Sequence, residues 1–214
     1  MTLSTQTLAL NKLGLVDYES AWEIQRQFHS EVADGSRPNT LILLEHPPVY
    51  TAGRRTVESE KPRDGSRVID VDRGGKITFH GPGQIVGYPI IRLKNGNDVV
   101  GFVRELEKAL IDICAEFKIA AERYCERSGV WIRDRQGDRK IAAIGLRVAR
   151  GVTMHGFALN VAPDLSFFDR IVPCGIADAA VTSLAAELGR EITSEEVMPV
   201  LERHMFEALQ RSMR

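Results

Sequence analysis

A glycine-rich segment in the first half of the chain restricts the possible folds more than any other feature. Residues 72–89, DRGGKITFHGPGQIVGYP, contain five glycines and two prolines in eighteen residues. Glycine permits positive φ angles and lets backbone N–H groups approach a ligand closely, so the segment predicts an unusual backbone path. A Gly-Pro-Gly sequence alone is typical of a tight turn. Arg73, Lys76 and His80 add polar groups beside it and favour a binding loop, although neither GxxxxGK[ST] nor GxGxxG is present to indicate a nucleotide site.

Size and composition limit the class of protein. The 214 residues predict one domain, 1–214, that needs no disulfide or metal for stability. A formal net charge of -1 argues against nucleic-acid binding through bulk electrostatics. Three cysteines without a CxxC pair fit a reducing compartment. We see no signal peptide and no apolar run long enough to cross a bilayer, so we expect a soluble, cytoplasmic protein without membrane contact.

Periodicity predicts a mixed fold. Asp17 caps one expected helix that ends at Gly35, and Asn97 or Asp98 caps a second. Thr193 and Glu196 have capping-box spacing and open a third, which requires Pro199 to lie in or near the first turn. Short apolar or alternating segments between turn residues predict strands at 40–46, 84–93, 129–134, 140–148 and 152–161. These elements predict an α/β or α+β domain with a mixed sheet.

The segment 139–161, RKIAAIGLRVARGVTMHGFALNV, contains two further features of interest. Lys140 begins an apolar, strand-like run. A lysine in such a place most often lies at the edge of a strand and extends its ammonium group to water. Period-two alternation in the second strand places His155 on the face of Phe157, with Gly156 and Ala158 on the opposite, narrow face. Such a face is needed where an acyl chain or another backbone lies close. A lone histidine such as His155 is more often structural than catalytic.

The three cysteines differ in their surroundings. Cys114 lies on the apolar stripe of its predicted helix and is expected in the core, whereas Cys125 lies near a turn and is either buried or idle. Cys174, in IVPCGIADAA, lies in a loop-like segment and is the best candidate nucleophile, with packing left as an equal alternative. A cysteine nucleophile needs a nearby cation to form its thiolate, because an unperturbed thiol has a pKa of about 8.5.

Lys140, His46, His80 and His155 are all available to supply that cation, and one sequence does not show which is adjacent. The residues alone therefore predict a thiol enzyme with a glycine-lined pocket, and leave the roles of the three histidines open.

Four blocks together resemble the lipoyl(octanoyl) transferase family. They are EHPPVYTAGR at 45–54, RGGKITFHGPGQIVGYP at 73–89, the lysine-headed block KIAAIGLRVARGVTMHGFALNV at 140–161, and FFDRIVPCGIADAAVTSL at 167–184. They occur in family order and cover most of the chain. The resemblance implies a fold like the catalytic domain of biotin and lipoate protein ligases, with a mixed sheet flanked by helices.

The resemblance also implies an activity and its residues. An octanoyl group moves from octanoyl-acyl carrier protein to a lysine of lipoyl domains through a thioester on Cys174, by a ping-pong mechanism in which Lys140 lowers the pKa of that thiol. No cofactor or metal is implied. The implied substrate-binding residues are Arg73, Gly74, Gly75, Lys76, Ile77, Thr78, Phe79, His80, Ala143, Ile144, Gly145, Gly156, Phe157 and Ala158. The apolar wall of this tunnel would read chain length, since each methylene contributes about 0.8 kcal/mol.

The implied partners are octanoyl-acyl carrier protein as donor, and as acceptors the lipoyl domains of 2-oxoacid dehydrogenase E2 subunits and the glycine cleavage H protein. A monomer is expected. Acyl carrier proteins are generally acidic, so Arg54, Arg55, Arg147 and Arg150 are candidates for docking the carrier. The alternative is that they are only solvated, as dispersed surface arginines usually are. Two alternatives remain: an ATP-dependent lipoate ligase relative, which would need no cysteine, and a non-catalytic module that binds acyl carrier or lipoyl domains.

Overall fold

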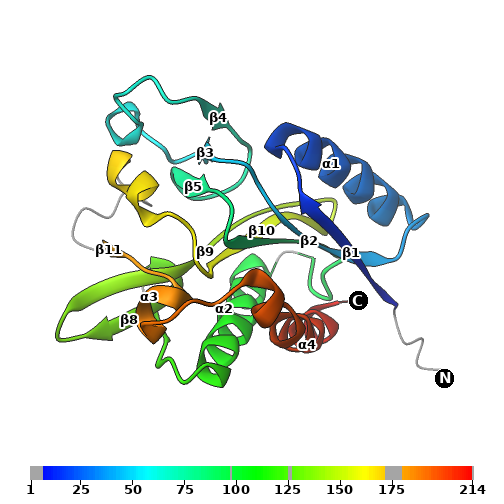
Figure 1. Ribbon diagram of the computed structural model, residues 1–214. Coiled ribbons are helices and arrows are strands. Elements are labelled where there is room, and N and C mark those ends of the chain that lie inside the picture. Colours follow the sequence, from blue (N-terminus) through cyan, green and yellow to red (C-terminus); the bar gives the residue numbers. More distant parts are fainter. Residues whose placement is uncertain (1–6, 97, 125–126, 172–179, 214) are drawn as a thin grey trace.

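A mixed β-sheet with helices on both faces forms the body of the protein (Figure 1). The computed structural model describes residues 7–96, 98–124, 127–171 and 180–213. Within them the main sheet has the order β1-β2-β6-β10-β9-β8-β7, and β11 pairs with β9. Its strands are β1 (Leu8–Leu15), β2 (Asn39–Glu45), β6 (Gln84–Ile90), β7 (Glu122–Tyr124), β8 (Arg127–Asp134), β9 (Gly137–Ala149), β10 (Val152–Asn160) and β11 (Ala180–Val181).

Most neighbours in the main sheet are antiparallel, and of the described strand pairs in that sheet only β1–β2 and β11–β9 are parallel. A second sheet has the order β4-β3-β5. Its strands are β3 (Val49–Ala52), β4 (Val68–Asp70) and β5 (Thr78–His80). The glycine-rich segment therefore begins in the loop between β4 and β5, continues through β5 in the small sheet and ends in β6 of the main sheet.

The helices begin and end where local sequence signals predict. Asp17 accepts hydrogen bonds from the first turn of α1 (Tyr18–Asp34), and Gly35 ends it in the left-handed conformation. Asp98 caps α2 (Val99–Glu116), while the alternative cap Asn97 lies outside the described residues. Thr193 caps α4 (Ser194–Ser212). The shorter helices are α3 (Leu184–Leu188) and the 3₁₀ helices η1 (Glu58–Glu60) and η2 (Leu165–Arg170).

The central strands are buried on both faces, which explains their nearly continuous apolar sequences. In β2, Leu41 and Leu43 join the core beneath α2 and α4, while Ile42 and Leu44 join the core beneath α1. Figure 1 shows α1 and the small sheet on one side of the main sheet, with α2, α3 and α4 on the other. The small sheet has its own apolar cluster with η2, which includes Phe79 and Phe168.

Two glycines allow β6 and β10 to pack at the centre of the sheet. A Cβ on Gly156 would lie 2.0 Å from the carbonyl oxygen of Gly87, and a Cβ on Gly87 would lie 2.2 Å from the ring of Phe157. Both positions therefore have room for hydrogen alone. This confirms the prediction that another backbone lies close to the face of Gly156.

The structure confirms the predicted class, the three main helices and the five expected strands, and it corrects one detail. Pro199 is the sixth residue of α4, just past the first turn, in agreement with the expected position in or near that turn. His155 is not on the face of Phe157, because its φ of 57° breaks the alternation and turns the ring toward Trp22 of α1. None of the helices within the described residues is long and apolar enough to span a membrane.

We predict that Gly156→Ala destabilises the fold by about 1–3 kcal/mol, because the methyl group collides with backbone that can move only with the sheet. The matched control is Gly96→Ala, where the new Cβ would be 3.7 Å from its nearest neighbour and should change stability by less than about 0.5 kcal/mol. Urea unfolding of the two variants measures the difference. Equal stability of both would contradict the close β6–β10 packing.

Candidate active site

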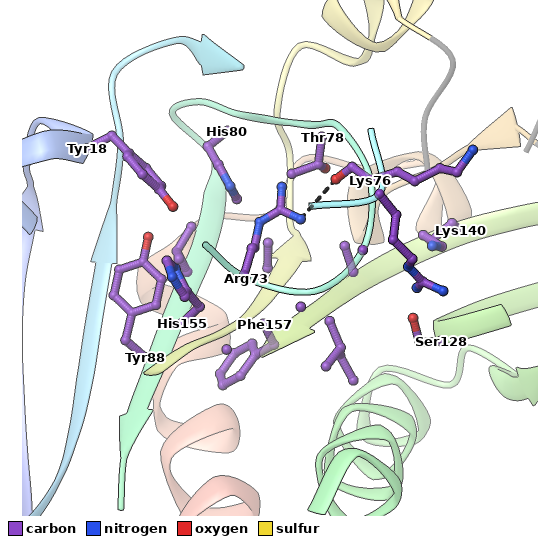
Figure 2. A pocket seen from close by; sticks show the side chains of 18 of the residues that line it. Tyr18, Arg73, Lys76, Thr78, His80, Tyr88, Ser128, Lys140, His155 and Phe157 are labelled. Carbon is purple, nitrogen blue, oxygen red and sulfur yellow. Dashed lines mark hydrogen bonds between the residues drawn. The ribbon is translucent and has the colours of Figure 1, made fainter. Parts of the chain in front are cut away.

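A cavity of about 200 Å³ lies between the glycine-rich segment and strands β9 and β10. Figure 2 shows most of its lining side chains, which come from both sheets and from α1. The described residues that line it are Tyr18, Arg55, Arg73, Gly75, Lys76, Thr78, His80, Val86, Tyr88, Arg127, Ser128, Lys140, Ala143, Ile144, Gly145, His155, Gly156, Phe157 and Ala158.

Arg73 holds the loop that forms one wall of the cavity. Its side chain is buried, and the guanidinium donates to the carbonyl oxygens of Gly74 (3.1 Å), Lys76 (2.9 Å) and Thr51 (2.8 Å). It also donates to the Thr51 hydroxyl at 2.9 Å. A planar guanidinium with several fixed donors suits this task, since it bonds carbonyls of the loop and of β3 at the same time.

Backbone contacts fix the same loop against the main sheet. The N–H of Gly74 donates to the carbonyl of Leu146 in β9 at 2.9 Å. A Cβ on Gly53 would lie 2.6 Å from the Gly75 carbonyl oxygen, and a Cβ on Gly145 would lie 3.0 Å from Arg73 Cδ. These glycines let three chain segments meet without side chains between them, which explains why the cavity is walled partly by backbone.

Lys140 lies at one end of the cavity, and at this end the cavity opens to solvent. Its side chain is buried, with Nζ 4.6 Å from the centre of the Trp131 ring. Its backbone lies between β8 and β11, opposite Trp131 and Val181 respectively. Ser128 and Arg55, which line the cavity, are exposed and form its mouth. A buried cation stacked on an aromatic ring is thus held beside the entrance.

The opposite end of the cavity is closed and polar. Tyr18 and Tyr88 are buried there, and burial raises the pKa of Tyr18 to about 12. His46 Nδ1 donates to the Val16 carbonyl at 2.6 Å, so its Nε2 accepts from the Tyr88 hydroxyl at 2.7 Å. Burial lowers the pKa of His46 to about 4, which keeps this ring neutral near pH 7.

A chain of buried hydrogen bonds runs from the loop to the strand next to Lys140. The Thr51 hydroxyl donates to His80 Nε2 at 3.3 Å, and His80 Nδ1 donates to Gln84 Oε1 at 2.7 Å. The Gln84 amide donates to Asn160 Oδ1, and Asn160 donates to the carbonyl of Thr182. Because burial holds the pKa of His80 well below its ordinary value, the ring stays neutral and this donor order is retained.

His155 is held by an acidic partner outside the cavity wall. Its Nε2 lies 2.7 Å from Asp72 Oδ1, and Asp72 is also paired with Arg147. The hydrogen bond from His155 lowers the pKa of Asp72, which therefore remains ionised near neutral pH. Burial lowers the pKa of His155 despite that carboxylate, so the ring is neutral, with its proton on Nε2.

Most of the residues implied by the resemblance lie together, with three exceptions. Gly74 does not line the cavity because its backbone is bonded to Leu146. Ile77 and Phe79 are in the separate core of the small sheet, because alternation along β5 turns them away from the side of Thr78 and His80. Cys174 lies outside the described residues, as does Cys125, and Cys114 is buried in the core as predicted.

Several lining residues were missed by the sequence analysis. Tyr18 comes from the first turn of α1, Tyr88 and Val86 from β6, and Ser128 and Arg127 from the start of β8. Val86 and Tyr88 belong to the glycine-rich segment itself, whereas no motif links Tyr18, Arg127 and Ser128 to it. Tertiary packing alone brings them together.

The arginines proposed for docking fall into two groups. Arg147 pairs with Asp72, and Arg150 pairs with Asp34, so both have acidic partners. Arg54 and Arg55 are exposed beside the loop, and Arg55 lines the mouth of the cavity. Among the described residues, no group of three or more His, Cys, Asp and Glu side chains is placed to hold a metal ion.

The sequence of the chain matches proteins of known family. The model of the lipoyl protein ligase A/B catalytic domain matches residues 17–206. An octanoyltransferase of Salinispora tropica is 59% identical over 207 residues, which cover 96% of this chain and 97% of that protein. The chain belongs to the octanoyltransferase family. Another member, from Mycolicibacterium smegmatis, is 59% identical over 191 residues, which cover 88% of this chain and 83% of the relative.

Solved structures of more distant proteins share the fold. A bipartite lipoate protein ligase of Thermoplasma acidophilum superposes with a TM-score of 0.70 at 17% identity, covering 96% of this chain and 85% of that one. The biotin protein ligase of Aquifex aeolicus gives a TM-score of 0.53 at 12% identity, covering 96% and 69%. These likenesses confirm the ligase-type catalytic fold expected for this octanoyltransferase family member.

We predict that His46 does not titrate near its ordinary pKa of 6.5 and that stability falls as the pH drops from 6.5 toward 4. His46 binds a proton in this range in the unfolded chain but not in the folded chain. Each such group therefore lowers the free energy of unfolding by about 1.4 kcal/mol for each unit by which the pH falls. NMR titration of the imidazole signals, with urea unfolding across the same range, measures both. The slope should decrease in His46→Gln, and a midpoint near 6.5 for His46 would contradict the account.

Proposed function

We propose that this protein transfers an octanoyl group from octanoyl-acyl carrier protein to a lysine of lipoyl domains through a thioester on Cys174. The observation that carries the proposal is the cavity with Lys140 at its open end and buried residues along its length. The membership of the octanoyltransferase family supports the same activity.

The walls of the cavity suit a saturated chain. Val86, Ala143, Ile144, Phe157 and Ala158 contribute apolar side chains to its lining. Removing an aliphatic chain from water contributes about 0.8 kcal/mol per methylene, so such walls can bind an acyl group without charged contacts. The reactive thioester carbonyl then lies at the mouth, near Lys140.

The position of Lys140 also supports a role for Cys174. The described chain resumes at Ala180, where β11 pairs with Arg139 and Lys140, and the N–H of Thr182 donates to the Lys140 carbonyl at 2.9 Å. Cys174 precedes Ala180 by six residues in the sequence. The segment that contains Cys174 is therefore connected directly to the strand beside Lys140.

The proposed reaction has two steps, a thioester exchange followed by an aminolysis. The Cys174 thiolate, stabilised by the Lys140 ammonium, attacks the donor thioester carbonyl, and Lys140 gives its proton to the departing carrier thiolate, which leaves as the thiol. The neutral amine of the acceptor lysine then attacks the enzyme thioester, the now neutral Lys140 accepts the proton that this amine loses, and Cys174 leaves as the thiolate, which restores the starting pair. Backbone N–H groups near Gly75 and Gly145 would stabilise the oxyanion of each tetrahedral intermediate. The donor is already activated, so no ATP is required.

For docking, we retain Arg54 and Arg55 as the contacts for an acidic carrier protein. Both are exposed next to the cavity mouth, whereas Arg147 and Arg150 already have acidic partners. Lipoyl domains of E2 subunits and of the glycine cleavage H protein are the proposed acceptors, approaching the same mouth after the carrier has left.

An ATP-dependent ligase is the alternative that the fold supports, because lipoate-protein ligase A with bound ATP superposes with a TM-score of 0.68 at 16% identity. A ligase would form an acyl adenylate and would need neither Cys174 nor a carrier thioester. The two activities therefore differ in their requirement for ATP and for the thiol.

We predict that incubation with octanoyl-acyl carrier protein adds one octanoyl group to the protein, without ATP, as a hydroxylamine-labile adduct. In Cys174→Ser this labile adduct is absent, and transfer to a lipoyl domain falls by about 10³-fold or more because the nucleophile is lost. Intact-mass spectrometry and a transfer assay measure the two effects.

The matched control is Cys114→Ala, because Cys114 is buried in α2 and burial raises the pKa of its thiol to about 12. This variant should keep the adduct. An adduct that survives in Cys174→Ser, or turnover of free octanoate that depends on ATP, would contradict the proposal.

A further inference from the structure

The closed end of the cavity differs from the apolar wall that the sequence predicts for reading chain length. Its lining there is Tyr18, Tyr88, His80 and His155, all of which are buried. Figure 2 shows the rings of Tyr18, Tyr88 and His155 grouped at the end opposite Lys140, with the two tyrosine hydroxyls turned toward one another. A saturated acyl chain has no hydrogen-bonding group to offer this surface.

One polar atom in this group has an unmet requirement. His155 is 1% exposed and lines the cavity, and its Nδ1 is buried without a hydrogen-bond partner among the described residues. Its Nε2 is held by the Asp72 carboxylate, which accepts and cannot donate, so Nε2 carries the ring proton. Nδ1 is therefore a fixed acceptor, and only a donor can satisfy it.

The backbone at His155 shows that this orientation is maintained against strain. Its φ of 57° lies in the left-handed region, which is unfavourable for a non-glycine residue inside a strand. The buried Gln25 side chain accepts from the His155 N–H at 2.9 Å, and Asp72 holds the ring. Two separate contacts therefore keep the imidazole at the end of the cavity.

We infer that the closed end of the cavity is a hydrogen-bonding subsite in which His155 Nδ1 accepts from an O–H group beyond the end of the acyl chain. This inference rests on the proposed function only in placing an acyl chain in the cavity. With an octanoyl chain, the O–H donor is a water molecule; with an ω-hydroxyacyl chain, it is the terminal hydroxyl of the chain itself.

This subsite makes His155 a specificity-determining residue. Each added methylene strengthens binding by about fourfold where an apolar wall continues. Displacing the O–H donor leaves a buried acceptor unpaired, which weakens binding by about fivefold to 150-fold. A chain long enough to expel the water is therefore disfavoured.

A pair of free acids of equal length tests the subsite in the wild-type protein without relying on turnover. Nonanoic acid and 8-hydroxyoctanoic acid differ only in a terminal methyl or hydroxyl group. We expect calorimetry to give a dissociation constant for 8-hydroxyoctanoic acid at least about tenfold lower than that for nonanoic acid. An apolar end would give the opposite order, because it would bury an unpaired hydroxyl.

Two variants separate hydrogen bonding from volume. His155→Leu keeps a side chain of similar size but removes the acceptor, and should reverse the order of the two acids. His155→Asn is smaller, tolerates the left-handed conformation and keeps an acceptor, so it should preserve the wild-type order. Thermal unfolding of both variants checks that they fold. If His155→Leu does not fold, the comparison of the two acids in the wild-type protein still tests the inference.

Tighter binding of nonanoic acid by the wild type would overturn the inference, as would failure of both acids to bind. The same holds if His155→Asn, rather than His155→Leu, loses the preference for the hydroxy acid. None of these results bears on the thioester at Cys174, which the octanoyl adduct tests separately.

Discussion

Four hydrogen bonds from the buried guanidinium of Arg73 hold the glycine-rich loop above the main sheet, and the cavity exists because that loop stays there. The acceptors lie on Thr51, Gly74 and Lys76, so one side chain joins the small sheet to both sides of the turn. Removing it would leave buried carbonyl groups unpaired, which costs about 1–3 kcal/mol for each group. The glycines at 53 and 145 complete this arrangement, since a Cβ at either position would press on the loop or on Arg73.

The same arginine begins the polar chain through His80, Gln84 and Asn160, which ends at the carbonyl of Thr182. The wall of the cavity and the strand beside Lys140 are therefore parts of one connected structure. A neutral His80 is required in this chain of hydrogen bonds, because a protonated ring would change the order of donors and acceptors along it. The fold thus fixes a buried lysine at the open end of an acyl-sized cavity and a set of buried polar groups at its closed end.

Local signals in the sequence predict the elements well and the site only in part. Asp17, Gly35, Asp98 and Thr193 act over a few residues, so the helix ends follow from them directly. The wall residues of the glycine-rich segment follow from the resemblance, but alternation in β5 sends Ile77 and Phe79 to another core. Tyr18 reaches the cavity only through the packing of α1 on the main sheet, which no local pattern reveals. The positive φ of His155 is likewise set by tertiary contacts with Gln25 and Asp72.

The central claim is that this cavity and Cys174 form one site, with Lys140 as the link between them. The pH dependence of Cys174 alkylation, measured in the wild type and in Lys140→Ala with the other thiols mapped by mass spectrometry, tests it most directly. If Lys140 lies beside the thiol, the midpoint should rise by about one pH unit or more in the variant, while Lys108→Ala on the exposed side of α2 leaves it unchanged. Identical profiles for the wild type and Lys140→Ala would separate the cysteine from the cavity and contradict the account.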